Sequence, residues 1–263
     1  MFEFTEGQVP VLVSFPHSGT WIPSDMIQHL TEQGKSVPDT DWFLPQLYDL
    51  PNVARCSRIV ATFSRYVIDV NRPPDGSNLY PGKPTPELCP STTFQGEPIY
   101  KADGPTPSQV QQRLQDYWLP YHDKIAAELD RMKRHFGYAL LYDAHSILSE
   151  VPRLFEGRLP DLNVGTAAGN SCDASLTAKV GDRLARNSTS YVINGRFIGG
   201  YITRHYGRPA ENIDAIQMEM AQCIYMDEAT GLWDDEKAKS TQAILAGLFD
   251  LLIDHANERA GAK

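Results

Sequence analysis

The chain has 263 residues, of which 41% are hydrophobic and 22% charged, so it can bury a core and need not be disordered. Its formal net charge is −9 and its pI is about 5.2, which argues against nucleic acid as a partner, because such binding needs concentrated Lys and Arg. No long apolar run and no basic-then-apolar leader is present, so neither membrane insertion nor secretion is expected.

The four cysteines stand far apart and form no CxxC pair. This spacing predicts free thiols in a reducing cytoplasm rather than a zinc knuckle or a disulfide framework. They are Cys56, Cys89, Cys172 and Cys223. We therefore expect a cytoplasmic protein, whose oligomeric state the sequence leaves open.

Short apolar runs predict buried strands that alternate with helical patterns. In chain order the strands are expected at residues 9–15, 58–63, 66–70, 138–142, 191–193 and 213–220. Apolar residues at helical spacing are Leu114 and Trp118, then Ile125 and Leu129 after a break at Pro120, then Leu176, Val180 and Leu184, and finally Ile244, Leu248, Leu251 and Leu252. The alternation predicts a single α/β domain over residues 1–263, with three layers and a central mixed, largely parallel sheet.

Residues 72–107 interrupt this pattern, because nine of the 19 prolines and four glycines fall there. A loop of this length is either disordered or functional. Its aromatic residues Tyr80, Phe94 and Tyr100 need somewhere to pack, so we expect an ordered loop folded over one end of the sheet.

Polar clusters follow the expected strands, where ligands gather in open α/β sheets. They are residues 16–19 (PHSG), 69–72 (DVNR), 143–146 (DAHS) and 217–220 (QMEM). Singly, each has an ordinary explanation: a loop histidine at His17, a capped turn at Asp143 and His145, or a plain ion pair between Asp69 and Arg72. In the third cluster, Asp143 or Ser146 could instead orient the His145 imidazole through its second nitrogen. Glu219 is harder to explain structurally, since burying a carboxylate within an apolar strand is costly unless it is paired or functional.

Together, the clusters indicate one type of reaction. Two imidazoles and one carboxylate can hold a zinc-like ion with an open position for water, and a further carboxylate can act as general base. Arginines can bind a substrate carboxylate through paired hydrogen bonds. For the third ligand, Asp39 and Asp41 are both available before a helical pattern, where either could be a cap. We expect Asp41 to be the ligand and Asp39 the turn or cap residue.

Seven segments in order make the chain resemble the N-formylglutamate amidohydrolase (N-formylglutamate deformylase) family of bacterial histidine degradation. They are FPHSGTWIP, DTDW, RYVIDVNRPPDGSNLYPG, YDAHS, DLNVGTAAGNSC, NGRFIGGYITRHYG and IQMEM, which span residue 15 to about residue 220. The family is similar in architecture to zinc carboxypeptidases and to deacylases of N-acyl aspartate and N-acyl glutamate. The resemblance therefore implies a zinc-carboxypeptidase-like fold.

The resemblance also implies roles for individual residues. His17, an acidic residue and His145 would hold one divalent metal ion, expected to be zinc, and Glu219 would be the base. Asn71 and Arg72 look like the Asn-Arg pair that holds a substrate carboxylate in the related peptidases.

Two further inferences complete the expected site. The related peptidases carry a glutamate ligand three residues after the first histidine; here that position is Thr20, so the acidic ligand must come from elsewhere. The glycine-rich segment at residues 199–205 would bring Arg204 to the substrate. We expect Arg72 and Arg204 to be the main clamps, with Arg65 and Asn71 in support.

The leading hypothesis is hydrolysis of N-formyl-L-glutamate to formate and L-glutamate. The same chemistry on another N-acyl amino acid or a formimidoyl group is the nearest alternative. A non-catalytic binding protein of the same fold is disfavoured because His17, His145, Arg72 and Glu219 are all present. A carboxypeptidase ranks third, since it needs an open groove where the Pro-rich loop suggests a cover.

Overall fold

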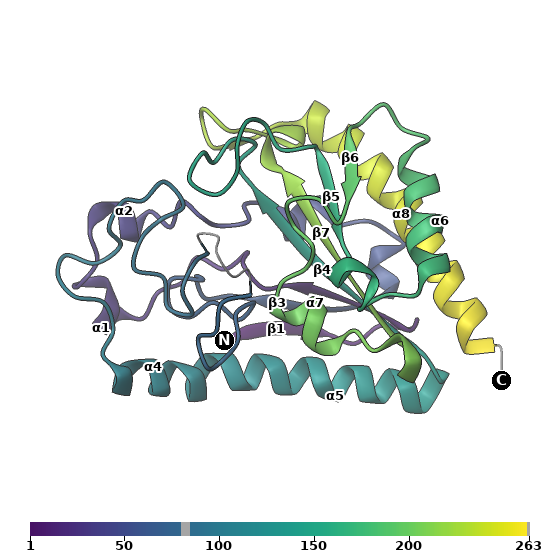
Figure 1. Ribbon diagram of the computed structural model, residues 1–263, viewed down its shortest axis with the longest axis horizontal. Coiled ribbons are helices and arrows are strands. Elements are labelled where there is room, and N and C mark those ends of the chain that lie inside the picture. Colours follow the sequence, from purple (N-terminus) through teal and green to yellow (C-terminus); the bar gives the residue numbers. More distant parts are fainter. Residues whose placement is uncertain (80–84, 262–263) are drawn as a thin grey trace.

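The computed structural model describes residues 1–79 and 85–261, and in them a seven-stranded sheet lies between two layers of helices (Figure 1). The strands are β1 (Phe2–Thr5), β2 (Val11–Phe15), β3 (Ser57–Ala61), β4 (Ala139–Ile147), β5 (Leu162–Gly165), β6 (Tyr191–Ile193) and β7 (Ile213–Ala221). Their order is β1-β3-β2-β4-β7-β5-β6. β3, β2, β4 and β7 are parallel neighbours, whereas β1 and β5 run antiparallel to β3 and β7. The sheet is mixed and largely parallel, as the sequence predicts.

Helices cover both faces of this sheet. They are α1 (Ser24–Ile27), α2 (Glu32–Lys35), α3 (Leu44–Leu47), α4 (Pro107–Arg113), α5 (Leu119–Phe136), α6 (Ala174–Leu184), α7 (Tyr201–Tyr206) and α8 (Asp235–Gly261). α5 and α7 pack on one face, while α3, α6 and α8 pack on the other (Figure 1). A small hairpin of β8 (Met226–Asp227) and β9 (Leu232–Trp233) precedes α8.

Side-chain alternation along β4 and β7 decides which layer contains the polar clusters, because successive side chains in a strand point to opposite faces. In β7, Ile216, Met218 and Met220 enter the core beneath α6 and α8. Ile213 and Ala215 lie in the core beneath α5 and α7. The remaining odd-numbered side chains of β7 therefore face the α5 and α7 side, and those of β4 do the same.

The strand expected at Tyr66–Val70 does not form, and that prediction was wrong. The segment is a series of turns in which Val67 N–H donates to the carbonyl of Ser64. Its apolar side chains are fully buried in the core beneath α5. The side chains of this run are apolar because they are buried, whatever the backbone conformation. The hydrophobic pattern of the sequence therefore did not distinguish a buried turn from a buried strand. β1 and β5 were not expected, and β4 continues five residues beyond the expected Tyr142.

The expected break at Pro120 is replaced by a continuous helical path. A π-helical turn, η2 (Leu114–Trp118), joins α4 to α5, and the Leu119 N–H donates to the carbonyl of Leu114. Pro120 then falls in the first turn of α5, where its missing N–H removes little. The wider turn accommodates the proline without ending the helix.

The long Pro-rich segment contributes to the cover over one end of the sheet. No helix or strand is present between Ala61 and Pro107 in the described part of the chain. Phe94 and Tyr100 are buried, as the expectation of an ordered loop requires, whereas Tyr80 lies outside the described residues. No described helix is long and apolar enough to cross a membrane.

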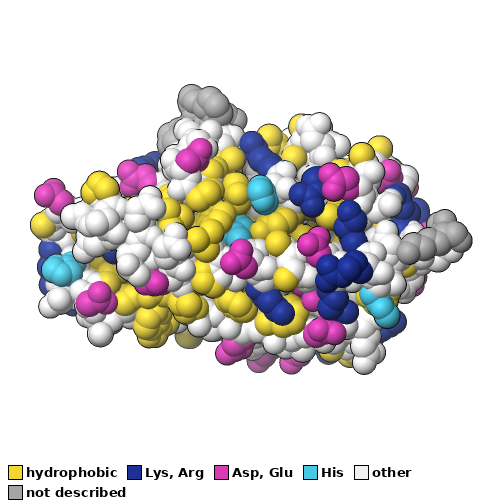
Figure 2. Space-filling view, turned by 90° about the horizontal axis from the view of Figure 1, so that it is seen from below, with side chains coloured by type: hydrophobic (Ala, Val, Ile, Leu, Met, Phe, Trp, Pro, Cys, Tyr) yellow, Lys and Arg dark blue, Asp and Glu magenta, His cyan; other side chains and the backbone are white. Residues whose placement is uncertain are grey.

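On the face of the molecule formed by α4 and α5, basic and acidic side chains are distributed differently (Figure 2). Basic side chains gather toward the end of the molecule where α5 finishes, and acidic side chains are scattered along the same face (Figure 2). The last turn of α5 contributes Lys133, Arg134 and His135. Cations at a helix C-terminus interact favourably with its dipole, so this cluster has a structural explanation.

Candidate functional site

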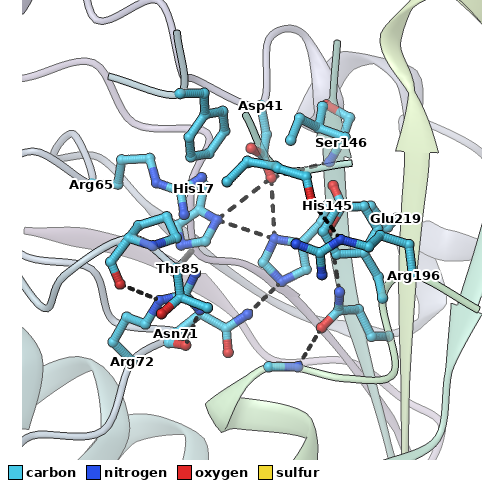
Figure 3. A pocket seen from close by; sticks show the side chains of 17 residues that line it. His17, Asp41, Arg65, Asn71, Arg72, Thr85, His145, Ser146, Arg196 and Glu219 are labelled. Carbon is cyan, nitrogen blue, oxygen red and sulfur yellow. Dashed lines mark hydrogen bonds and ion pairs between the residues drawn. The ribbon is translucent and has the colours of Figure 1, made fainter. Parts of the chain in front are cut away.

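The four polar clusters meet in one cavity at the carboxyl end of the parallel strands (Figure 3). Of the residues expected from sequence, the cavity lining includes His17, Asp41, Arg65, Asn71, Arg72, His145 and Glu219. The Pro-rich segment adds Thr85, Pro86 and Phe94 to the wall. Segments far apart in sequence therefore build a single site, as the strand-end argument predicts.

His17, Asp41 and His145 form a buried group that could hold a metal ion. The Nδ1 atoms of His17 and His145 are 3.1 Å apart, and Asp41 Oδ2 lies 3.2 Å from His145 Nδ1 and 3.8 Å from His17 Nδ1. Ligands bound at about 2.0–2.1 Å in a tetrahedral arrangement stand roughly 3.3 Å apart. The spacing of these three atoms fits such an ion.

Two carboxylates hold the outer nitrogens of these histidines. His17 Nε2 lies 2.7 Å from Asp69 Oδ1, and His145 Nε2 lies 3.0 Å from Asp143 Oδ2. A carboxylate beside Nε2 favours the tautomer with its proton there, which leaves the Nδ1 lone pair available for a metal. Asp143 was one of the two residues expected from sequence to orient His145, the other being Ser146, and its carboxylate is the one beside Nε2. The role of Asp69 was missed from sequence, where an ion pair with Arg72 was the ordinary explanation.

The charges of these groups follow from burial and from their neighbours. Burial and the Arg65 charge lower the pKa of His17, outweighing the opposite effect of Asp69. Burial would also lower the pKa of His145, but Asp143 and Asp41 raise it well above its usual value. Burial would raise the pKa of Asp69, yet the charges of His17 and Arg65 hold it well below its ordinary range. The negative charges of Asp41 and Asp143 favour a proton on His145. The same negative charges would favour a metal cation bound beside His145 in place of that proton.

Asp39 has a different environment from Asp41. Its Oδ2 accepts hydrogen bonds from the Tyr66 hydroxyl at 2.7 Å and from the Phe94 N–H at 2.9 Å. Asp39 is therefore neither a helix cap nor part of the potential metal group, but attaches the Pro-rich segment to the rest of the molecule. Of the two aspartates that the sequence left open, Asp41 is the one in the group.

Glu219 enters the cavity from β7, next to His145 in the sheet register. Alternation directs its two methionine neighbours to the opposite face, which explains an acidic side chain within an apolar strand. Burial, with Asp41 and Asp143 nearby, raises the pKa of Glu219 to about 8. A divalent cation in the adjacent group would favour the ionised carboxylate and lower this pKa.

Asn71 is held at both ends of its amide. Its Oδ1 accepts from the Ile202 N–H at 2.8 Å, so its Nδ2 faces His145 and Asp143. Gly200 passes so close to this amide that a Cβ at that position would collide with it. These contacts fix Asn71 between α7 and His145, and the glycine is required by the close approach.

The structure changes the expected set of arginines. Arg65 and Arg72 both line the cavity, although they flank the segment at residues 66–70 for which the sequence predicted an extended strand. Turns at residues 66–70 bring them together. Arg65 donates to Asp69 Oδ2 at 2.7 Å, and Arg72 donates to the carbonyls of Pro86 and Asn71.

Arg204 does not line this cavity in the described structure. Its Nε and Nη1 donate to the carbonyls of Gly199 and Leu79, and it borders a surface groove on the outer side of α7. Arg196, from the same glycine-containing segment, lies in the cavity instead, with Nε donating to the Leu154 carbonyl at 2.8 Å. Sequence reasoning missed Arg196; the quoted motif NGRFIGG contains it, but a motif does not determine which way a loop turns.

Comparisons with known proteins identify the family of this chain. The family model described as N-formylglutamate amidohydrolase matches residues 9–226. N-formylglutamate deformylase of Pseudomonas aeruginosa is 46% identical over 263 residues, covering 98% of each chain, and that of Pseudomonas putida is 44% identical with the same coverage.

Two solved structures share the fold. N-formylglutamate amidohydrolase from Ralstonia eutropha has a TM-score of 0.82 at 24% identity, covering 98% of this chain and 97% of that one. A gene product of Agrobacterium tumefaciens has a TM-score of 0.72 at 15% identity, covering 97% and 95%. With the family model spanning most of the sequence and two curated relatives matching along their whole length, this chain belongs to the N-formylglutamate amidohydrolase family.

Proposed function

We propose that the protein hydrolyses N-formyl-L-glutamate to formate and L-glutamate, using one divalent metal ion, expected to be zinc, held by His17, Asp41 and His145. The observation that carries this proposal is the group of three buried donor atoms with the Glu219 carboxylate in the same cavity. The names of the two curated relatives support the substrate.

When bound, the ion would lower the pKa of a water molecule and polarise the formyl carbonyl. Glu219, which lines the same cavity, would take a proton from the attacking water at its carboxylate. It would then deliver the proton to the amide nitrogen, so that glutamate leaves as the amine. Asp69 and Asp143 keep the two histidines oriented throughout.

The arginines of the cavity suit a substrate with two carboxylates. Arg72 and Arg196 are proposed as its main contacts, since both side chains line the cavity and come from segments far apart in the sequence (Figure 3). Arg65 supports the site by pairing with Asp69, and Asn71 by donating to Asp143, the carboxylate that orients His145. We propose Arg196 in place of Arg204 as the second clamp, because Arg204 borders the outer groove whereas Arg196 lines the cavity.

We also infer a relationship to the zinc carboxypeptidases. Two histidines associated with neighbouring strands of a mixed sheet, with an acidic residue beside them, support it. The acid comes from the segment after Pro38 rather than from position 20, where this chain has Thr20. Cytoplasmic location follows from the same proposal and is supported by four free cysteines, three of them buried.

Formate release from a panel of N-acyl amino acids, with and without a chelator, tests this function. N-formyl-L-glutamate should be the best substrate, and the chelator should abolish turnover until zinc is restored. Glu219→Gln should retain the metal and lose roughly 10²–10⁴-fold in kcat, because an amide cannot accept the proton. Full activity after verified metal removal would overturn the metal assignment, and metal loss in Glu219→Gln would make Glu219 a ligand.

A further inference from the structure

Gln217 lies two residues before Glu219 in β7 and shares its face of the strand. It is 4% exposed and lines the same cavity. A buried amide has a donor end and an acceptor end, and each needs a partner. The two partners of Gln217 determine which end faces the site.

The backbone of the glycine segment fixes the amide. Gly200 N–H lies 2.7 Å from Gln217 Oε1, and a backbone N–H can only donate. The oxygen of Gln217 must therefore face Gly200, and its Nε2 must face the other way. There Nε2 donates to Glu219 Oε2 at 3.3 Å.

The hydrogen bond from Gln217 affects how the Glu219 carboxylate can act as a base. It engages one carboxylate oxygen of Glu219, so the remaining oxygen is the one available to a water molecule in the cavity. Hydrogen bonds to an ionised group are also stronger than those between neutral groups. Gln217 thus connects the orientation of Glu219 to the position of Gly200, which packs against Asn71.

We propose that Gln217 is a positioning residue, whose amide, anchored by the Gly200 N–H, orients the Glu219 carboxylate for proton transfer. The inference rests on the proposed role of Glu219 as general base. It predicts that Gln217 acts on turnover through Glu219, and that it contributes little to the binding of substrate.

Two substitutions separate the two ends of the amide. Gln217→Met removes both hydrogen bonds and keeps a side chain of similar volume. Gln217→Glu keeps an oxygen for the Gly200 N–H but provides no donor to Glu219 when ionised. Both should lower kcat on the order of ten- to a hundredfold while KM for N-formyl-L-glutamate stays within about twofold. If the contact with Gly200 were the only role, Gln217→Glu would retain normal turnover, and the inference would fail.

A double-mutant cycle with Glu219→Gln completes the test, with metal content and thermal melting measured for every variant. Gln217→Met should cause no further loss of kcat in the Glu219→Gln background, because there is no longer a base to orient. An equal fold loss in both backgrounds would show that Gln217 acts independently and overturn the inference. Normal kcat in Gln217→Met alone would overturn this inference and leave the base intact, whereas normal kcat in Glu219→Gln would overturn both.

Discussion

Successive side chains of a strand point to opposite faces of the sheet, and this alternation determines which side chains of β4 and β7 point toward the cavity. In β4, Leu140 and Tyr142 enter the core under α8, and the alternate positions Asp143 and His145 face the site. Glu219 follows the same rule in β7. His17, His145 and Glu219 could therefore be predicted from the sequence, because strand ends and alternation are local properties.

The arginines were less predictable than the ligands. Arg196 and Arg204 lie eight residues apart in one glycine-containing segment, yet only Arg196 lines the cavity of the described structure. The direction of an irregular loop depends on its tertiary contacts, here the bond from Arg196 to the Leu154 carbonyl. Sequence patterns carry little information about such contacts.

Replacing Arg196 by Met should raise KM for N-formyl-L-glutamate about ten- to a hundredfold, because a charged hydrogen bond to a substrate carboxylate is lost. The effect on neutral N-formyl-L-glutamine should be small. Arg204→Met is the matched control, and it should leave KM for both substrates near normal. Steady-state kinetics with the two substrates measures this. An equal loss on both substrates in Arg196→Met would indicate a structural role.

Among the elements, α5 and the π turn before it support the Asn71–Arg72 segment from behind. Trp118 Nε1 donates to the Arg72 carbonyl at 3.0 Å, and His122 Nε2 donates to the Val70 carbonyl at 2.8 Å. The two side chains are four residues apart and stack, as neighbours on one helix face do. A helix thus fixes a turn that carries site residues, in place of the strand that the apolar run suggested.

His122 should make stability depend on pH. Burial lowers its pKa from 6.5 to about 3, so below pH 6.5 the unfolded chain binds a proton that the folded protein excludes. The contribution of His122 to stability is therefore greatest above pH 6.5 and falls as the pH decreases toward 3. Between about pH 7.5 and about pH 5.5 this one group should cost about 1.4 kcal/mol.

Urea unfolding at the two pH values, for the native protein and for His122→Gln, measures this contribution. The variant keeps an amide donor for the Val70 carbonyl but cannot be protonated in this range. The native protein should lose about 1.4 kcal/mol more than the variant on acidification. Equal losses in the two proteins would contradict a neutral, buried His122.

At the scale of the whole molecule, the potential metal group joins three separate segments. His17 follows β2, Asp41 precedes α3, and His145 lies within β4. The molecule has a net charge of −9, yet Arg65, Arg72 and Arg196 line the cavity, so guanidinium groups are present where an anionic substrate is expected to bind. Folding brings these residues together, and a bound ion would hold the three segments in place.

Removing the metal should therefore lower the melting temperature. At about 100 times the dissociation constant, an ion that binds only the folded state adds about 2.7 kcal/mol, or roughly 5–10 °C for a chain of this size. Thermal melts with and without chelator measure the shift. His17→Ala should not respond to chelator, whereas Asp39→Asn, outside the group, should respond fully. A response retained in His17→Ala would place the ion elsewhere.

The sequence by itself determined the α/β class, most strands and helices, and the polar clusters at strand ends, because periodicity and burial are encoded in neighbouring residues. It also supplied the family resemblance, which the comparisons confirmed. The tertiary structure decided what depends on distant contacts: the buried turn at Tyr66–Val70, the partners of Asp39 and Asp41, and the presence of Arg196 instead of Arg204 in the cavity. The physical reason is that a loop takes its direction from the surfaces it packs against, and those surfaces exist only after distant segments have come together.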